Sequence, residues 1–122
     1  MTESKPKKQS IAIDFDGTLC EYPKFIAPDK IPYEPIEGAR DAVVTLSKYF
    51  KIVVFSVRAK TEPGKKAIAE WMSKHDIPYN SITDRKPSSV LYIDDNAIRF
   101  EGDWKKILHA VSDWKHYLKN KK

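Results

Sequence analysis

The chain has 122 residues, of which 41% are hydrophobic and 32% are charged. This length fits one folded domain, and this composition is that of a globular protein rather than a disordered chain. The longest apolar runs, such as 52–55, have four residues, whereas a bilayer-spanning helix needs about 20. Because the first ten residues also lack the apolar centre of a signal peptide, we expect a cytoplasmic protein with no membrane partner.

The single cysteine, Cys20, cannot form an internal disulfide and has no second thiol with which to hold zinc. The net charge of +5 is concentrated at the ends, because residues 1–10 carry +2 and residues 115–122 carry +4, which leaves about −1 for the body. Lysine-rich ends are usually solvated and frayed. We therefore expect a disordered basic tail over 1–9, one domain over 10–118 and a basic end over 119–122.

Four short runs rich in β-branched and aromatic residues predict strands. These runs lie at 10–15, 51–57, 79–83 and 89–94, with turn residues on either side.

Helical periodicity predicts helices over 36–50 and 62–75, the second of them opened by Thr61. A third helix is expected to begin near Asp103 and could break around 112–113. The side chains expected to face the core include Trp71 and Met72 in the second helix, and Trp104, Ile107, Leu108, Val111 and Leu118 in the third.

The alternation of strands and helices predicts an α/β fold in which helices cover both faces of a mainly parallel sheet. Ligands of such sheets bind at the carboxyl ends of the strands. The segment 20–35 carries four prolines and is the one long irregular stretch. Loops of this length in a compact domain are often functional.

Acidic pairs follow the first and last predicted strands. Asp14 and Asp16 come at the end of the first strand, and Asp94 and Asp95 at the end of the last. Crowded carboxylates repel one another unless a cation or proton offsets their charge. Because Mg²⁺ prefers oxygen ligands, these four residues predict a magnesium site.

Groups suited to binding phosphate lie at the same predicted edge. Gly17 allows a sharp turn and close backbone approach, and Thr18 offers a hydroxyl and an amide. Ser56 and Arg58 follow the second strand, and either Arg85 or Lys86 supplies another cation before the last strand. A nucleophile, a metal and fixed positive charge are what phosphoryl transfer requires.

Four motifs in this order, IAIDFDGTL, VVFSVRA, DRKP and VLYIDDNA, resemble those of the haloacid dehalogenase-like (HAD) phosphatases. The resemblance spans residues 11–97 and implies a Rossmann-like three-layer sandwich. The two positions at which that superfamily inserts a cap domain hold only the segment 20–35 and, further on, one helix and one strand. The chain therefore resembles a member without a cap domain.

The resemblance also implies roles for single residues. Asp14 would be the nucleophile that forms an aspartyl-phosphate, and Asp16 would be the general acid and base. Ser56 would bind the transferring phosphoryl group, and Lys86, favoured over Arg85, would neutralise its charge. Magnesium would be held by Asp14, the backbone carbonyl of Asp16, and Asp94, with Asp95 further out. Gly17, Thr18 and Arg58 complete the predicted phosphate-binding set.

Alternative interpretations accompany this hypothesis. Asp16-Gly17 could be an ordinary turn, and Asp94 with Asp95 could cap a helix. A non-catalytic HAD-like binding or regulatory domain is one functional alternative, and a phosphatase of nucleic-acid ends tethered by the basic tails is another. The main hypothesis is a magnesium-dependent phosphomonoester hydrolase with a phosphorylated small molecule or an open macromolecule as substrate. The leaving group and the oligomeric state are not predicted.

Overall fold

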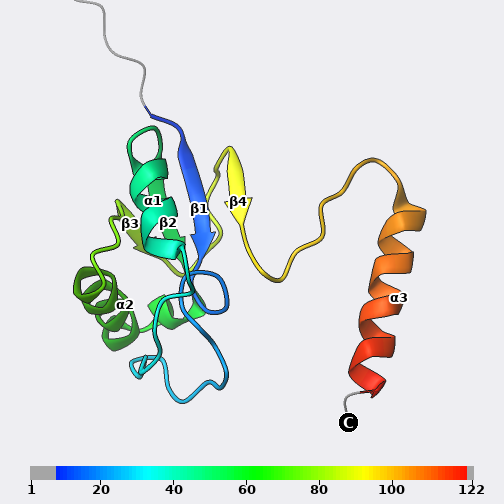
Figure 1. Cartoon of the computed structure of the whole chain (residues 1–122), viewed down its shortest axis with the longest axis horizontal. Coiled ribbons are helices and arrows are strands. Elements are labelled where there is room, and N and C mark those ends of the chain that lie inside the picture. Colours follow the sequence, from blue (N-terminus) through cyan, green and yellow to red (C-terminus); the bar gives the residue numbers. More distant parts are fainter. Residues whose placement is uncertain (1–7, 121–122) are drawn as a thin grey trace, which may run out of the picture.

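The computed structural model describes residues 8–120, with side chains through residue 114. Its centre is a sheet of four strands in the order β3-β2-β1-β4, and every neighbouring pair is parallel (Figure 1). The strands are β1 Ser10–Asp14, β2 Lys51–Phe55, β3 Ser81–Thr83 and β4 Leu91–Ile93. The predicted α/β class with a Rossmann-like parallel sheet is therefore confirmed. The expected basic tail lies mostly outside the described residues.

The helices form where the sequence supplies starting signals. They are α1 Ala39–Ser47, the short 3-10 helix η1 Val57–Lys60, α2 Glu62–Lys74 and α3 Trp104–Asn120. The Thr61 hydroxyl accepts a hydrogen bond from the Gly64 amide at 3.1 Å and so caps α2. α1 is shorter than the predicted 36–50, because Gly38 at its start has a φ of 87° and the backbone before it is not helical.

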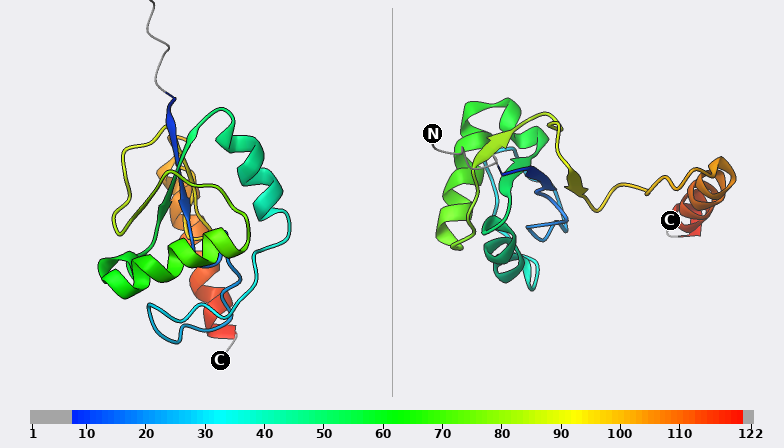
Figure 2. Two further views of the ribbon diagram at one scale, coloured as in Figure 1. Left: turned by 90° about the vertical axis from the view of Figure 1, so that its left-hand side faces the viewer. Right: turned by 90° about the horizontal axis from the view of Figure 1, so that it is seen from above.

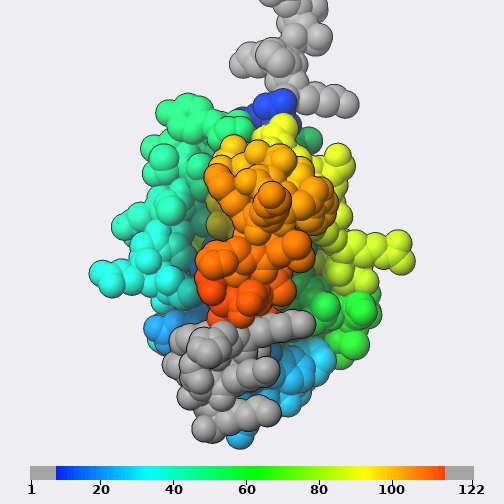
Figure 3. Space-filling view, turned by 90° about the vertical axis from the view of Figure 1, so that its right-hand side faces the viewer, coloured from blue at the N-terminus to red at the C-terminus, as the bar shows by residue number. Residues whose placement is uncertain are grey.

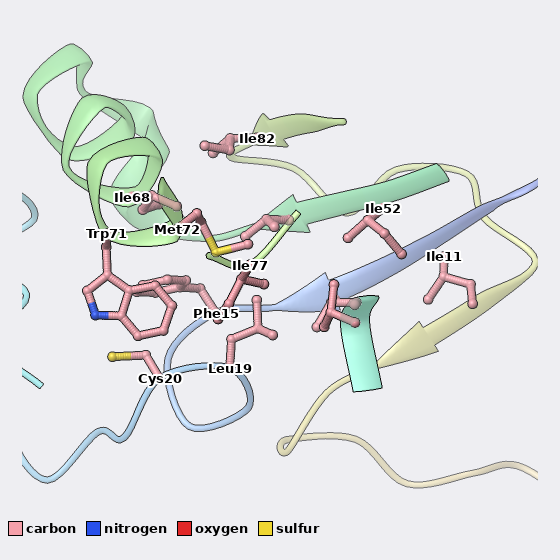
Figure 4. Close-up of a cluster of buried hydrophobic side chains, with 13 residues drawn as sticks. Ile11, Phe15, Leu19, Cys20, Ile52, Ile68, Trp71, Met72, Ile77 and Ile82 are labelled. Atoms are coloured by element: carbon pink, nitrogen blue, oxygen red, sulfur yellow. The ribbon is translucent and has the colours of Figure 1, made fainter. Parts of the chain in front are cut away.

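One face of the sheet carries the hydrophobic core. Ile11, Ile13, Ile52 and Val54 alternate along β1 and β2 with residues of the other face, and each is at most 2% exposed. α1 contributes Val43 to this cluster, and α2 contributes further side chains that surround Phe15 (Figure 4). The side chains from α2 are Ile68, Trp71 and Met72. The prediction that Trp71 belongs to the core is confirmed.

The other face of the sheet is covered by an irregular segment. Ser10 lies on this face, and its hydroxyl is 3.0 Å from that of Ser89. Tyr92 of β4 pairs with Ala12 of β1, so its side chain lies on the same face. Its hydroxyl donates a hydrogen bond to the Pro87 carbonyl at 2.7 Å. The connection between β3 and β4 therefore packs where a helical layer was expected.

α3 lies apart from the sheet, beyond β4, in both Figure 1 and the right-hand view of Figure 2. As predicted, it begins after Asp103, whose carboxylate accepts a hydrogen bond from the backbone N–H of Lys105 at 2.9 Å. It runs without interruption through 112–113, so the break considered there does not occur. The prediction that Trp104, Leu108 and Val111 face the core is wrong, since they are 68%, 69% and 36% exposed, and the side chain of Leu118 lies outside the described residues. No helix within residues 8–120 combines the length and hydropathy that crossing a bilayer requires.

Candidate active site

Three adjacent strands deliver polar side chains to one edge of the sheet. Asp14 is the last residue of β1, Ser56 directly follows β2, and Asp94 directly follows β4. Because the strands are parallel, their carboxyl ends coincide, as the pairing of Asp14 with Phe55 shows. These residues line a cavity of about 360 Å³. The convergence expected from the sequence is thus present in the structure.

Three of the four predicted metal-binding carboxylates form a tight cluster. One oxygen each from Asp14, Asp94 and Asp95 can be chosen so that all lie within 4.8 Å of one another. The Thr18 hydroxyl lies 3.3 Å from both Asp14 Oδ2 and Asp95 Oδ1. The same hydroxyl oxygen accepts a hydrogen bond from the backbone N–H of Asp95 at 3.1 Å. Thr18 therefore ties the first motif to the last through the carboxylates, in addition to any contact with a phosphate.

The electrostatics of the cluster favour a bound cation. Burial raises the pKa of Asp14 to about 7, with further contributions from a hydrogen bond to Asp95 and from the negative charges of Asp94 and Asp95. The hydrogen bond from Thr18 acts in the opposite direction. A divalent cation would remove this repulsion, and an all-oxygen donor set suits Mg²⁺. The residues present therefore fit the predicted ion.

Gly17 is required by the shape of this site. Its φ is +85°, and a Cβ built on it would lie 2.4 Å from Asp95 Oδ2. Its amide is already donated to the Cys20 carbonyl at 2.8 Å. In this structure Gly17 makes room for Asp95, whereas the sequence suggested that it makes room for a phosphate.

Asp16 is held by Arg58 rather than by the acidic cluster. The Arg58 Nε–H lies 3.0 Å from each Asp16 carboxylate oxygen. Burial raises the pKa of Asp16, and the charge and hydrogen bond of Arg58 partly counteract this rise. The side chain of Asp16 still lines the cavity, so it is placed to exchange a proton with a ligand there.

Arg58 is 1% exposed, and its Nε and Nη1 are bonded within the protein, whereas its buried Nη2 has no hydrogen-bond partner among the described residues. Besides Asp16, its Nη1 donates to the carbonyls of Ala27 at 2.7 Å, Pro28 at 3.1 Å and Lys30 at 3.3 Å. The guanidinium thus fastens the irregular segment 20–35 to the strand that carries Ser56. Arg58 does not line the cavity with Asp14, and its predicted role in binding substrate phosphate stays a prediction.

Ser56 and Lys86 differ in how they are placed. Ser56 is 6% exposed and lines the cavity. Its hydroxyl oxygen accepts a hydrogen bond from the backbone N–H of Arg58 at 3.1 Å, so the hydroxyl proton can be donated to a ligand. Lys86 instead lies over the Tyr92 ring, with Nζ 4.4 Å from the ring centroid. Arg85 is exposed, and its amide donates to Thr83 Oγ1 at 3.2 Å. Among the described residues, neither cation lines the cavity with Asp14.

The cavity also has lining residues that the sequence reasoning did not single out. Asp84 follows β3, so the rule about strand ends could have found it. Phe55, Val57 and Asn96 are neighbours in sequence of predicted residues. Tyr22 comes from the proline-rich segment, and no pattern in the sequence placed it here. The complete additional set is Tyr22, Phe55, Val57, Asp84 and Asn96.

Comparison with known proteins supports the fold. No family model and no curated protein matches the chain. A chain of a solved structure described as "Structure of Pnkp1/Rnl/Hen1 complex" aligns with a TM-score of 0.51 and 17% sequence identity. The alignment covers 88% of this chain and 36% of the other, so the present chain spans about a third of that protein. The likeness concerns the α/β architecture alone.

Proposed function

We propose that this protein is a magnesium-dependent phosphomonoester hydrolase with an HAD-like mechanism. The observation that carries the proposal is the convergence of Asp14, Asp94 and Asp95 within 4.8 Å at the carboxyl edge of a parallel sheet. Asp16 and Ser56 line the same cavity. This combination supplies a nucleophile, a proton donor and a hydroxyl ligand for the phosphoryl group.

In the first step, a carboxylate oxygen of Asp14 attacks phosphorus while the bond to the leaving oxygen breaks. Asp16 gives its proton to that oxygen, a role that suits a carboxyl whose pKa is raised by burial. In the second step, Asp16 takes a proton from water, which attacks the phosphorus and releases inorganic phosphate and free Asp14. Each proton given by Asp16 in the first step is thereby recovered in the second.

The other residues position these groups. Ser56 donates its hydroxyl to an equatorial phosphoryl oxygen, and Arg58 fixes the orientation of Asp16. A magnesium ion held by Asp14, Asp94 and Asp95, with the Asp16 carbonyl as a further candidate, would neutralise charge on the phosphoryl group and keep Asp14 ionised near neutral pH. Lys86 remains the proposed second source of positive charge, and it would have to leave Tyr92 to act on the phosphoryl group.

The test is hydrolysis of an aryl phosphate with and without Mg²⁺. Asp14→Asn keeps the shape of the side chain and removes its nucleophilic oxygen, so turnover should fall by at least about 10³-fold. Asp41→Asn is the matched control, since this carboxylate is 86% exposed on α1 and should leave the rate unchanged. An Asp14→Asn variant as active as the Asp41→Asn variant would disprove the assigned nucleophile. A wild-type protein without turnover would instead favour the non-catalytic binding domain.

A phosphorylated nucleic-acid end is a second candidate substrate. α3 exposes Lys105 and Lys106, and a hollow lined by Asp95 and Asn96 extends to this helix. Basic side chains beside a phosphatase site would bind a phosphate backbone and release counterions. Oligonucleotides ending in phosphate should then be hydrolysed faster than the aryl phosphate, and this advantage should fall steeply with added salt.

A further inference from the structure

The C-terminal third of the chain exposes a series of large apolar side chains. Leu91 and Ile93 of β4 are 58% and 39% exposed, although their neighbours in β1 are buried. In Figure 3, which views the molecule from this side, the atoms of α3, coloured orange to red, lie over the middle of the face. The apolar residues that follow β4 are Ile98, Phe100, Trp104, Leu108, Val111 and Trp114, each at least 36% exposed. Apolar surface gathered in this way marks an interface.

α3 has the pattern of a helix with a partner. Trp104, Leu108 and Val111 recur at steps of three and four residues and so form one apolar stripe. Within the described residues, no helix or strand packs closely on this stripe. An isolated helix of this length is marginal in water, since tertiary packing supplies most of the stability of protein helices.

A hollow separates this stripe from the end of the sheet. Its volume is about 500 Å³, and Ile98, Ala110, Val111 and Trp114 supply its apolar wall. The space lies between the connection after β4 and α3, so it is bounded by two segments that each need apolar contacts. Water in such a space leaves both surfaces solvated, which costs free energy in proportion to their area.

We propose that the chain forms a homodimer in which α3 of each copy fills the hollow of the partner and packs against the partner's β4. A second copy supplies both halves of the contact, a helix that needs covering and a strand that needs a helix. With twofold symmetry the order across the interface is β4, the partner's α3, α3 and the partner's β4. Both surfaces are then covered and no apolar face is left over, as in an exchange of identical elements.

The dimensions agree with a stable dimer. α3 has 17 residues, which corresponds to a length of about 25 Å. Two such helices, each buried against a strand and against the other, cover on the order of 1,500 Å², the size of a standard interface. The connection over 94–103 is irregular and extended, as an exchanged element requires.

The experiment begins with the molar mass of the full chain, measured by light scattering during gel filtration over a range of concentrations. The wild type should be a dimer at micromolar concentrations. Leu108→Glu on α3 and Leu91→Glu on β4 should each raise the dissociation constant by about 30-fold or more. Tyr49→Asp is the control, because this side chain is 67% exposed far from α3 along the chain and the variant should stay dimeric. A monomeric wild type, or a Leu108→Glu variant that dimerises like the control, would overturn the proposal.

Cross-linking distinguishes exchange from a helix that folds back on its own chain. Leu91→Cys protein mixed with Leu108→Cys protein should give a covalent dimer with a short bismaleimide, since the native thiol of Cys20 is buried. The double variant should likewise give dimers. If the double variant is cross-linked within one chain and the mixture gives no dimer, α3 covers its own sheet and the exchange is refuted.

Discussion

Replacing Gly17 by alanine would test whether the acidic cluster is a metal site. The added Cβ would lie 2.4 Å from Asp95 Oδ2 and 3.0 Å from its Cγ, so the carboxylate has to move. Asp95 is exposed and can swing outward, but it then leaves Asp14 and the hydroxyl of Thr18. The substitution should therefore damage cation binding more than it damages the fold.

Gly38→Ala is the matched control for this substitution. Gly38 has a φ of +87°, nearly that of Gly17, and a Cβ there meets no atom within 4 Å. Both variants carry the same backbone strain, which costs about 1–2 kcal/mol of stability. Only Gly17→Ala displaces a carboxylate, and displacing a group that holds a metal site in shape typically lowers affinity by about 10–100-fold.

The assay is titration of each variant with Mg²⁺ by calorimetry, together with denaturation by urea. We expect both variants to lose similar stability in the absence of metal, and only Gly17→Ala to bind Mg²⁺ more weakly than the wild type. The phosphatase rate at limiting Mg²⁺ should follow the same order. Equal Mg²⁺ affinity in the two variants would refute the assignment of Asp95 to the metal site.

Three further outcomes follow from the geometry. Arg58→Lys removes the guanidinium contacts to Asp16 and to three loop carbonyls, so urea denaturation should show a loss of about 2–4 kcal/mol. Because Arg58 lowers the pKa of Asp16, which must be protonated to act as the general acid, the alkaline limb of the rate profile should move to higher pH; an unchanged profile would contradict the positioning role. Trp71→Phe loses the hydrogen bond to the Tyr33 carbonyl at 2.8 Å and should cost about 1–3 kcal/mol in the same measurement, whereas no loss would contradict it. In metal-free protein, the pKa of Asp14 is raised from 3.8 to about 7, so between these pH values the folded state binds the extra proton and stability falls as pH rises. Screening of this partly exposed carboxylate limits the fall to about 1–2 kcal/mol; Asp14→Asn should abolish this contribution, and an unchanged slope in that variant would refute the assignment.

The sequence predicted the parts of the site that depend on strand ends. Asp14, Ser56 and Asp94 each end or directly follow a run rich in β-branched and aromatic residues, and in a parallel sheet the ends of such runs must meet. This rule needs only the strand assignments, which the clustered β-branched residues made plain. The same rule also brings Asp84, which follows β3, to this edge, beside the cations Arg85 and Lys86.

The sequence could not predict which way long side chains turn. Arg58 and Lys86 both follow or precede strands, and both have enough reach to enter the cavity or to leave it. Arg58 turns toward Asp16 and three carbonyls of the proline-rich segment, whose path depends on tertiary packing. Lys86 turns toward Tyr92, which itself is fixed by Pro87 and Ser89. Such choices depend on contacts between distant residues that no local pattern encodes.

α3 shows a related limit of periodicity. The stripe of Trp104, Leu108 and Val111 correctly predicted a helix, but its expected burial against the core is wrong. Periodicity states that a face needs apolar contact, but it does not state which molecule supplies that contact. The expected packing on the chain's own sheet does not occur, and Leu91 and Ile93 of β4 stay exposed beside their buried neighbours in β1.

The acidic edge of the sheet is costly for an isolated domain, and that cost is an argument for its function. Thr18 supplies a hydroxyl within reach of Asp14 and Asp95, yet burial and, after it, the hydrogen bond to Asp95 and the repulsion among these carboxylates still raise the pKa of Asp14. A cluster selected for stability alone would place a lysine or arginine among the carboxylates, and the nearest buried cation, Arg58, is instead bonded to Asp16. Among the side chains that the structure describes, no lysine or arginine forms an ion pair with the three carboxylates, which is what a site needs if it is to take its positive charge from a divalent ion.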